Sequence, residues 1–234
     1  MSARAVPLVR APDPSSRAIG RALATTALER IPPEERAWIA RIESRRPAVT
    51  ELARGFADMC ALWSVPKIWG RLHLRLVREL RPRTCLELGT AFGMSAAYQA
   101  AALELIGEGR VVTVEGEPRF VAIARETFEG LGLASRVEQR VGAIEEVLGD
   151  VAGDVAPVEF ALLDAEHTER ATVDAFETLL PHLAAGAVVV VDDIAINEDM
   201  SRAWNAIRSS ARVAHAVDLR RLGIAVLGST GPRR

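Results

Sequence analysis

Between Thr84 and the C-terminus, short apolar runs alternate with longer amphipathic segments, and this alternation constrains the fold most. The apolar runs are TCLELG, RVVTVE, RVEQRV, VEFALLD and GAVVVVDD. Between them lie SAAYQAAALEL, PRFVAIARETFEGLG, AIEEVLG and TVDAFETLLPHL, which have the periodicity of helices. Strands that are apolar on both faces and alternate with helices indicate a parallel sheet covered on both sides. The sequence therefore predicts a doubly wound α/β fold.

The two ends of the chain depart from this pattern. The last two apolar runs, ARVAHAVDL and LGIAVLG, are separated by too few residues for a crossover helix and should pair antiparallel. Before Thr84 the text is helical from Ser16 to about Leu80, and residues 1 to about 15 form a proline-containing arm. We expect an N-terminal arm with helices over residues 1–80 and a ligand-binding domain over residues 81–234.

Composition excludes several functions. The chain has 234 residues and a formal net charge of −2, which argues against binding to a nucleic-acid backbone. No stretch approaches the roughly 18 apolar residues of a membrane span, and the N-terminus lacks the apolar core of a secretory signal. Two cysteines are too few for a disulfide framework. We expect a cytoplasmic protein that binds neither nucleic acid nor membrane.

The loop after the first predicted strand, LELGTAFGMS, is rich in glycine. No lysine is nearby, so it is not a P-loop, and Ala91 stands where a dinucleotide fingerprint needs its second glycine. Glu87, two residues before Gly89, would repel a pyrophosphate but can accept a hydrogen bond from an ammonium group. Glu115 ends the second strand, where a carboxylate can bind ribose hydroxyls. The pattern indicates a cationic nucleoside such as S-adenosylmethionine; a tight strand-to-helix turn is the alternative.

These motifs resemble those of the class I S-adenosylmethionine-dependent methyltransferases, in particular the metal-dependent O-methyltransferases around catechol O-methyltransferase and the macrocin-type enzymes. The resemblance runs from about Val65 to the C-terminus. It implies a Rossmann-like methyltransferase fold, with a mostly parallel seven-stranded sheet whose last strand is antiparallel. It also implies a set of cofactor-binding residues, taken from the covering segment SVPKIWG, the loop LELGTAFGMSA, the strand VVTVEGEP, the adenine segment RVGAIEEVL and the end of the fourth strand. These residues are Val65, Glu87, Gly89, Ser95, Glu115, Gly142, Ala143 and Asp164.

Acidic residues follow two of the predicted strands. VVVVDDI runs into Asp192 and Asp193, and the neighbouring strand ends at Asp164. Three carboxylates at one sheet edge favour a cation among them, and oxygen ligands suit Mg²⁺. The alternative is that Asp192 and Asp193 cap the next helix. The resembled enzymes bind metal with an aspartate after the fourth strand and an Asp-Asn pair after the fifth, which implies Asp164, Asp192 and Asp193 as ligands, although related enzymes use similar acidic edges without metal.

His167 is the predicted general base. It follows Asp164 by three residues, where the catechol enzyme has a catalytic lysine, and an imidazole exchanges protons near neutral pH. A helix-end histidine exposed to water is the alternative. His73, His182 and His215 lack this position next to the acidic edge.

The sequence thus predicts an S-adenosylmethionine-dependent O-methyltransferase that acts on a small hydroxylated substrate with help from Mg²⁺ or another divalent cation. A metal-independent small-molecule methyltransferase, acting on oxygen or nitrogen, and a non-catalytic S-adenosylmethionine-binding protein are the alternatives. Trp38, Trp63 and Trp69 can offer aromatic walls to the substrate. Apolar faces on the N-terminal helices predict a homodimer.

Overall fold

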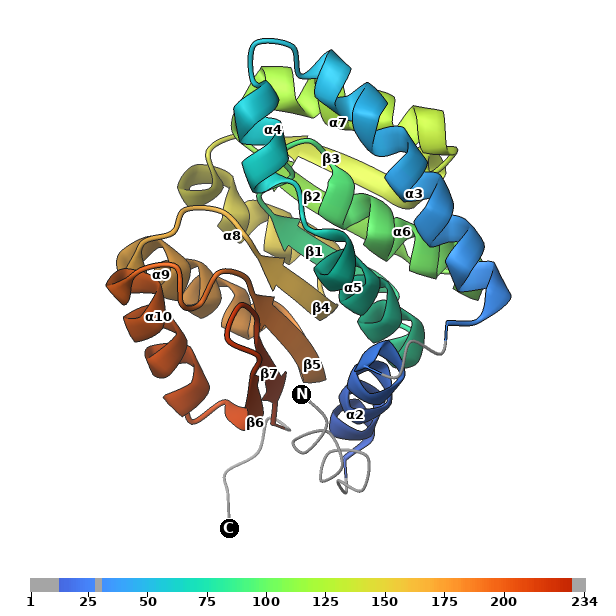
Figure 1. The fold of residues 1–234 in the computed structure, drawn as a ribbon. Helices are drawn as coiled ribbons and strands as arrows, with labels where there is room; N and C mark the ends of the chain where they lie inside the picture. The colour runs from blue at the N-terminus through green and yellow to red at the C-terminus, as the bar shows by residue number, and fades with distance from the viewer. Residues whose placement is uncertain (1–12, 28–30, 229–234) are drawn as a thin grey trace.

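A seven-stranded sheet organises the chain (Figure 1). The computed structural model describes residues 13–27 and 31–228, so most of the predicted N-terminal arm lies outside the described residues. The strands follow the predicted apolar runs closely. They are β1 (Thr84–Leu88), β2 (Arg110–Glu115), β3 (Val137–Val141), β4 (Val158–Leu163), β5 (Leu183–Val191), β6 (Val213–Asp218) and β7 (Gly223–Leu227).

The strand order is β3-β2-β1-β4-β5-β7-β6. Strands β1 to β5 pair in parallel, and β7 lies antiparallel between β5 and β6. The predicted fold class, including the reversed last strand, is confirmed. Because β1 pairs with both β2 and β4, the strand order reverses at β1, and the loops after β1 and β4 meet at the switch point where α/β proteins bind ligands.

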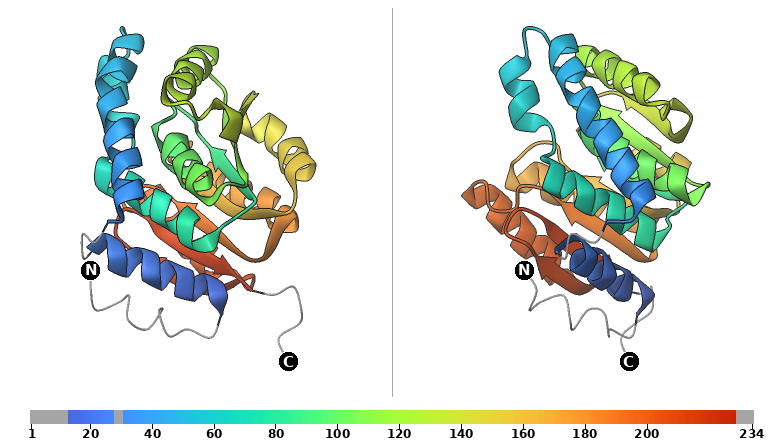
Figure 2. Two further views of the ribbon diagram at one scale, coloured as in Figure 1. Left: turned by 90° about the vertical axis from the view of Figure 1, so that its right-hand side faces the viewer. Right: turned by 45° about the vertical axis from the view of Figure 1, so that its right-hand side comes forward.

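Helices cover both faces of the sheet (Figures 1 and 2). On one face, α2, α5, α6 and α7 lie side by side over the strands, and α3 forms an outer layer over α6 and α7. On the other face lie α8, α9 and α10. Among the described residues the helices are α2 (Pro14–Ala27), α3 (Pro33–Leu52), α4 (Ala57–Trp63), α5 (Lys67–Leu80), α6 (Met94–Ile106), α7 (Pro118–Leu131), α8 (Ile144–Val155), α9 (Glu169–Leu179) and α10 (Glu198–Ser209).

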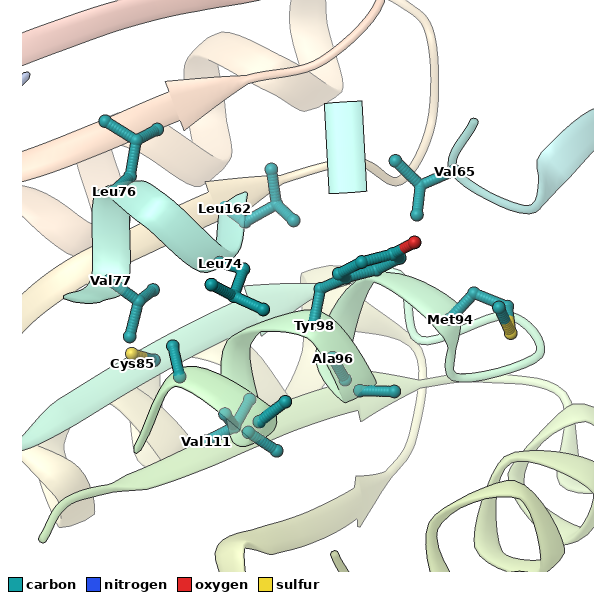
Figure 3. Close-up of a cluster of buried hydrophobic side chains, with 14 of the residues drawn as sticks. Val65, Leu74, Leu76, Val77, Cys85, Met94, Ala96, Tyr98, Val111 and Leu162 are labelled. Atoms are coloured by element: carbon teal, nitrogen blue, oxygen red, sulfur yellow. The ribbon is translucent and has the colours of Figure 1, made fainter. Parts of the chain in front are cut away.

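The core is continuous between the N-terminal helices and the sheet. Leu74 and Val77 of α5 belong to the same buried cluster as Cys85 of β1 and Tyr98 of α6 (Figure 3). The predicted division at residue 80 stays a prediction, but α5 itself packs directly on the strands. No helix within residues 13–27 and 31–228 has both the length and the apolar character needed to cross a membrane.

The segment TVDAFETLLPHL is shorter as a helix than the sequence predicts. Helix α9 ends at Leu179, a 3₁₀ turn η3 covers Leu180–His182, and Leu183 already begins β5. Pro181 accounts for the early end, because proline has no N–H for the helix ladder and its ring clashes with the preceding turn.

Candidate functional site

A cavity of about 1400 Å³ opens at the carboxyl ends of the parallel strands. Typical small-molecule pockets measure roughly 300–1,000 Å³, so this one has room for a nucleoside cofactor together with a second small molecule. The cavity combines the glycine-rich loop after β1, the ends of β2 and β4, the start of α8 and the loops after β5 and β6. Most of the predicted site residues line it, namely Val65, Gly89, Ser95, Glu115, Ala143, Asp164, His167 and Asp193.

The glycine-rich loop turns sharply between β1 and α6. Gly89 has a φ of 92°, and a Cβ built on it would lie 2.0 Å from the backbone oxygen of Asp164. Gly89 is therefore required both by its backbone conformation and by the close approach of the segment after β4. The cofactor loop and the acidic edge are therefore in direct backbone contact at Gly89 and Asp164.

Glu115 reaches across from the end of β2 to this loop. Its Oε2 accepts a hydrogen bond from the backbone N–H of Ala91 at 2.8 Å, and its Oε1 accepts one from the N–H of Glu117 at 2.9 Å. Each carboxylate oxygen keeps a second lone pair. Glu115 thus stands in the cavity wall, fixed by the backbone, with capacity left for hydroxyl donors.

Glu87 differs from its predicted position. Its side chain has no exposure and does not line the cavity within the described part of the chain. It accepts hydrogen bonds from Thr113 Oγ1 at 2.8 Å and Gln99 Nε2 at 3.1 Å. Burial raises the pKa of Glu87 to about 7, against the lowering effect of hydrogen bonds from Ser95, Thr113 and Gln99. The Glu87 carboxylate thus links β1 to α6 through its hydrogen bond with Gln99. This geometry does not support the predicted direct contact with an ammonium group.

Of two other predicted cofactor residues, Val65 lines the cavity and Gly142 does not. Gly142 does not line the cavity, although Ala143 beside it does. Val65 lies in the cavity wall, and its backbone oxygen accepts a hydrogen bond from Arg46 Nη2 at 2.9 Å. Arg46 also pairs with Glu43, which accepts a hydrogen bond from Tyr98 at 2.6 Å. The segment predicted to cover the cofactor is therefore fastened to α3 and α6.

His167 stands between two of the predicted carboxylates. Its Nε2 lies 3.5 Å from Asp193 Oδ2 and 3.8 Å from Asp164 Oδ1. Within the described residues this nitrogen is shielded from solvent and has no hydrogen-bond partner. The backbone oxygen of His167 accepts a hydrogen bond from Asn197 Nδ2 at 3.0 Å, which fixes the loop after β4 to the start of α10.

Asp192 is fully buried and is not among the residues that line the cavity. It receives a bidentate pair of hydrogen bonds from Arg221, with Nε at 2.9 Å from Oδ1 and Nη2 at 3.1 Å from Oδ2. Arg221 Nη2 also lies 3.3 Å from Asp193 Oδ1. Sequence reasoning missed Arg221, because nothing distinguishes it from Arg220 until β7 pairs with β5 and brings the β6–β7 turn next to Asp192.

The arrangement does not fit the predicted metal site. Among the described residues no group of three or more His, Cys, Asp or Glu side chains is placed to hold a metal ion. Both oxygens of Asp192 and one of Asp193 face the Arg221 guanidinium, which occupies the side where a shared cation would lie. The Mg²⁺ prediction therefore finds no support in these donors.

The acidic edge remains short of positive charge. Burial raises the pKa of Asp164 well above its usual range, and the Asp192, Glu87 and Asp193 carboxylates raise it further, while Arg221 opposes them. The pKa of Asp193 is raised too, by burial and by Asp192. A cationic ligand in the cavity would relieve this repulsion.

One of the three tryptophans considered for the substrate wall lies at the cavity. Trp63 is half exposed, lines the cavity and packs edge-on against Phe120, with ring centroids 5.9 Å apart. Trp38 and Trp69 instead pack partly buried against the main core and do not line the cavity. Leu62 and Ile196, both largely exposed, extend the apolar rim beside Trp63.

Solved methyltransferases have the same architecture. The O-methyltransferase TomG of Streptomyces achromogenes, involved in tomaymycin synthesis and solved with S-adenosylmethionine, gives a TM-score of 0.67 at 24% identity over 78% of this chain and 89% of that one. An O-methyltransferase of Bacillus cereus solved with S-adenosylhomocysteine gives 0.60 at 21% identity, covering 96% of this chain and 97% of that one. The fold is that of the class I methyltransferases.

Sequence comparison identifies the part of the chain that is similar to a known family. Residues 86–194, which carry the cofactor loop, Glu115, His167 and the aspartates, match the family model described as Methyltransferase domain. A catechol O-methyltransferase of Mycobacterium tuberculosis is 31% identical over 125 residues, covering 53% of this chain and 54% of that protein. The chain spans about half the length of the curated relatives it matches. The resemblance predicted from the motifs is confirmed.

Proposed function

We propose that this protein is an S-adenosylmethionine-dependent O-methyltransferase that acts on a hydroxyl group of a small molecule. One observation carries the proposal: a single cavity is lined both by the glycine-rich loop with Glu115 and by His167 between two aspartates. A cofactor cradle and a proton acceptor in one cavity are what a methyl transfer to oxygen requires.

The described residues fit the cofactor. Glu115 offers free lone pairs to ribose hydroxyls, the Gly89 turn leaves the cavity open beside Asp164, and Val65 with Ala143 supplies apolar wall. Asp164, Asp192 and Asp193 share a single guanidinium, that of Arg221, and the remaining negative charge favours a cationic ligand over a neutral one. When bound, this cofactor supplies a methyl group on a positively charged sulfur. Relatives with S-adenosylmethionine or S-adenosylhomocysteine in their structures support the same choice.

His167 is the group that we assign as general base. His167 lines the cavity, and its Nε2, shielded from solvent, has no hydrogen-bond partner among the described residues, so we assign this nitrogen to accept the proton of an acceptor hydroxyl. Asp193 and Asp164, at 3.5 and 3.8 Å, are too far to bind the nitrogen directly but close enough to stabilise the imidazolium that forms. The loop that holds His167 is fixed by Asn197, which keeps the imidazole in place.

The acceptor follows from what remains of the cavity. Trp63, Leu62 and Ile196 give its rim an apolar character, which suits a small, partly apolar molecule with a hydroxyl group. The metal-assisted form of the reaction is not included in the proposal, because Arg221 occupies the side of Asp192 and Asp193 that a metal would share. The homodimer and the cytoplasmic location stay predictions.

The test is methyl transfer itself. The protein is incubated with S-adenosylmethionine carrying an isotopically labelled methyl group and with a panel of small phenols, catechols, sugars and amines, and the labelled product is identified by mass spectrometry. Labelled ethers are expected. If only amines are labelled, the acceptor atom is nitrogen and the proposed O-methylation is wrong. Cofactor binding without any labelled product would refute the enzymatic proposal.

His167→Ala tests the base. Turnover should fall by about a hundredfold or more, while the affinity for S-adenosylmethionine stays the same, since the imidazole acts on the acceptor. His182→Ala is the matched control, because His182 lies in η3 and does not line the cavity. Equal turnover of His167→Ala and the wild type would refute the assignment.

A further inference from the structure

Arg221 takes the position that the sequence gives to a divalent metal. The guanidinium contacts Asp192 through two parallel hydrogen bonds at 2.9 and 3.1 Å, and its Nη2 lies 3.3 Å from Asp193 Oδ1. A bidentate guanidinium–carboxylate pair is a geometrically specific, charge-assisted contact, unlike a chance surface ion pair. The contact is also sheltered, since Asp192 has no exposed side-chain surface.

We infer that the Arg221 guanidinium is a built-in cation that holds Asp192 and Asp193 in place of a divalent metal, so that the site works without one. The inference rests on the proposed function where it concerns catalysis, but its structural part concerns only which cation the aspartates bind. Arg221 is a positioning residue in this scheme, because it acts on the acceptor through Asp193 and His167.

The chain anchors Arg221 firmly enough for this role. Arg221 lies in the turn between β6 and β7, and its backbone oxygen accepts a hydrogen bond at 2.9 Å from the N–H of Ile194, directly after the Asp192–Asp193 pair. The same turn is closed by a hydrogen bond from the N–H of Leu219 to the oxygen of Leu222 at 2.9 Å. The strand pairing that aligns Val191 with Gly223 fixes both segments relative to each other.

No other described cation takes over this task. His73 on α5 lies near Asp192, but it is fully buried, neither ring nitrogen has a partner among the described residues, and burial lowers its pKa to about 4. It is therefore neutral at pH 7. Within residues 13–27 and 31–228, Arg221 is the one side chain that places a positive charge against the buried Asp192 carboxylate, which would be strongly unfavourable without it.

The contacts form a chain that ends at the proposed base. Arg221 lies against Oδ1 of Asp193, and the other oxygen of that carboxylate, Oδ2, lies 3.5 Å from His167 Nε2. Asp193 has a φ of 52°, in the left-handed region, so its backbone conformation is an uncommon one that the surrounding contacts have to maintain. Arg221 therefore sets the orientation of the carboxylate that faces His167.

Removing the guanidinium should convert the acidic edge into a metal site. In Arg221→Ala, the oxygens of Asp192 and Asp193 lose their cation while Asp164 stays beside them, and free carboxylate oxygens bind Mn²⁺. The probe is Mn²⁺ alone, followed by electron paramagnetic resonance, since the signal of the free ion decreases on binding. Arg220→Ala is the matched control, because Arg220 is the neighbouring arginine of the same turn and also lines the cavity.

The expected result is that the wild type and Arg220→Ala leave Mn²⁺ free, whereas Arg221→Ala binds it at least about tenfold more tightly. Adding Asp193→Ala to Arg221→Ala should abolish that binding. Mn²⁺ binding by the wild type as tight as that by Arg221→Ala would overturn the inference.

Because loss of one member of a buried pair can unfold a protein, Arg221→Gln is tested in parallel; it keeps a hydrogen-bond donor but no charge. Mn²⁺ should raise the melting temperature of Arg221→Ala and Arg221→Gln and leave that of the wild type unchanged. A wild-type melting temperature that rises with Mn²⁺ as much as those of the variants would count against the inference.

An activity arm separates this inference from the proposed function. With an acceptor from the methylation panel, the chelator-treated wild type should keep full turnover, and Arg221→Ala should need Mn²⁺ or Mg²⁺. If no acceptor is methylated but the Mn²⁺ pattern is as expected, the cation assignment stands and the proposed function fails. If the wild type methylates only with added metal, the proposed function stands and the inference about Arg221 fails.

Discussion

Replacing Glu87 with glutamine should make the protein more stable above pH 7 and flatten the dependence of its stability on pH. Glu87 has no exposed surface and is held by Thr113 and Gln99 inside the sheet–α6 interface. Burial raises its pKa from an ordinary 4.5 to about 7, and the nearby Glu115 adds to this effect against three opposing hydrogen bonds. The folded protein therefore binds a proton at Glu87 more tightly than the unfolded chain does.

The difference between the pKa of Glu87 in the folded and the unfolded protein sets the sign and size of the effect of pH on stability. Between pH 4.5 and 7 the folded state holds a proton that the unfolded state has lost, so the free energy of unfolding decreases as the pH rises. The contribution is fully present below about pH 4.5 and is lost as the pH passes through about 7. At about 1.4 kcal/mol per pH unit, the loss amounts to roughly 3 kcal/mol, a large part of the 5–15 kcal/mol that stabilises a typical domain.

Glutamine keeps the shape and the acceptor for Thr113 but cannot ionise. When the Gln99 amide, which now donates through Nε2, turns over, the new amide can donate to Gln99 Oε1, a buried oxygen that has no hydrogen-bond partner in the described residues. Urea unfolding followed by tryptophan fluorescence, repeated from pH 5 to 8.5, gives the free energy of unfolding at each pH. The difference between Glu87→Gln and the wild type should grow with pH and level off above pH 7.

Glu146→Gln is the control, because Glu146 is an exposed glutamate of α8 and its replacement should leave the wild-type slope unchanged. Parallel curves for Glu87→Gln and the wild type over the whole range would refute the reasoning. So would a difference of the opposite sign, since it would mean that the ionised carboxylate is the better-bound form.

Two further substitutions test the cradle around the cavity. Gly89→Ala should destabilise the protein by several kcal/mol more than Gly107→Ala in urea unfolding, because both glycines have a φ near 90° but only the Gly89 Cβ would strike a backbone atom, at 2.0 Å from Asp164 O; equal losses would show that the left-handed backbone alone matters. Arg46→Met removes the hydrogen bond to the backbone of Val65 and should weaken S-adenosylmethionine binding by about tenfold or less in calorimetry, whereas Arg45→Met, which loses a bond to Glu126 instead, should leave that affinity unchanged.

The fold was accessible from the sequence because hydrophobic periodicity reports on local structure and on burial together. Six of the seven strands lie within one or two residues of the apolar runs, and β5 begins three residues before its run GAVVVVDD. The reversed β7 follows from the short connection after β6. The end of α9 was missed although Pro181 is visible in the sequence, because the apolar pattern runs on past it into β5. Periodicity does not separate a helix from a strand that continues its apolar face.

The site could be predicted from the sequence only in part, and Glu87 shows why. A residue at the end of a strand can point toward the loops or into either face of the sheet, and alternation along β1 decides between the faces. Leu86 and Leu88 pack on the α8–α10 side, whereas Cys85 packs on the α5–α6 side. Glu87 shares the face of Cys85, where Gln99 and Thr113 meet it. Only the packed structure identifies those partners.

The role of Arg221 could not be predicted from the sequence. Its presence changes the charge balance of the acidic edge. The motif resemblance implies two aspartates and an asparagine around a divalent cation, a set whose charges cancel. Here Asp164, Asp192 and Asp193 face one guanidinium, which leaves two negative charges beside the cavity before any carboxylate takes up a proton. Burial is the larger cause of the raised pKa values of Asp164 and Asp193, and the neighbouring carboxylates add to it. The remaining negative charge can be neutralised by protons or by a cationic ligand. If Arg221 stands in place of a divalent metal, the positive charge of the proposed cofactor therefore contributes more to its binding than it would beside a metal.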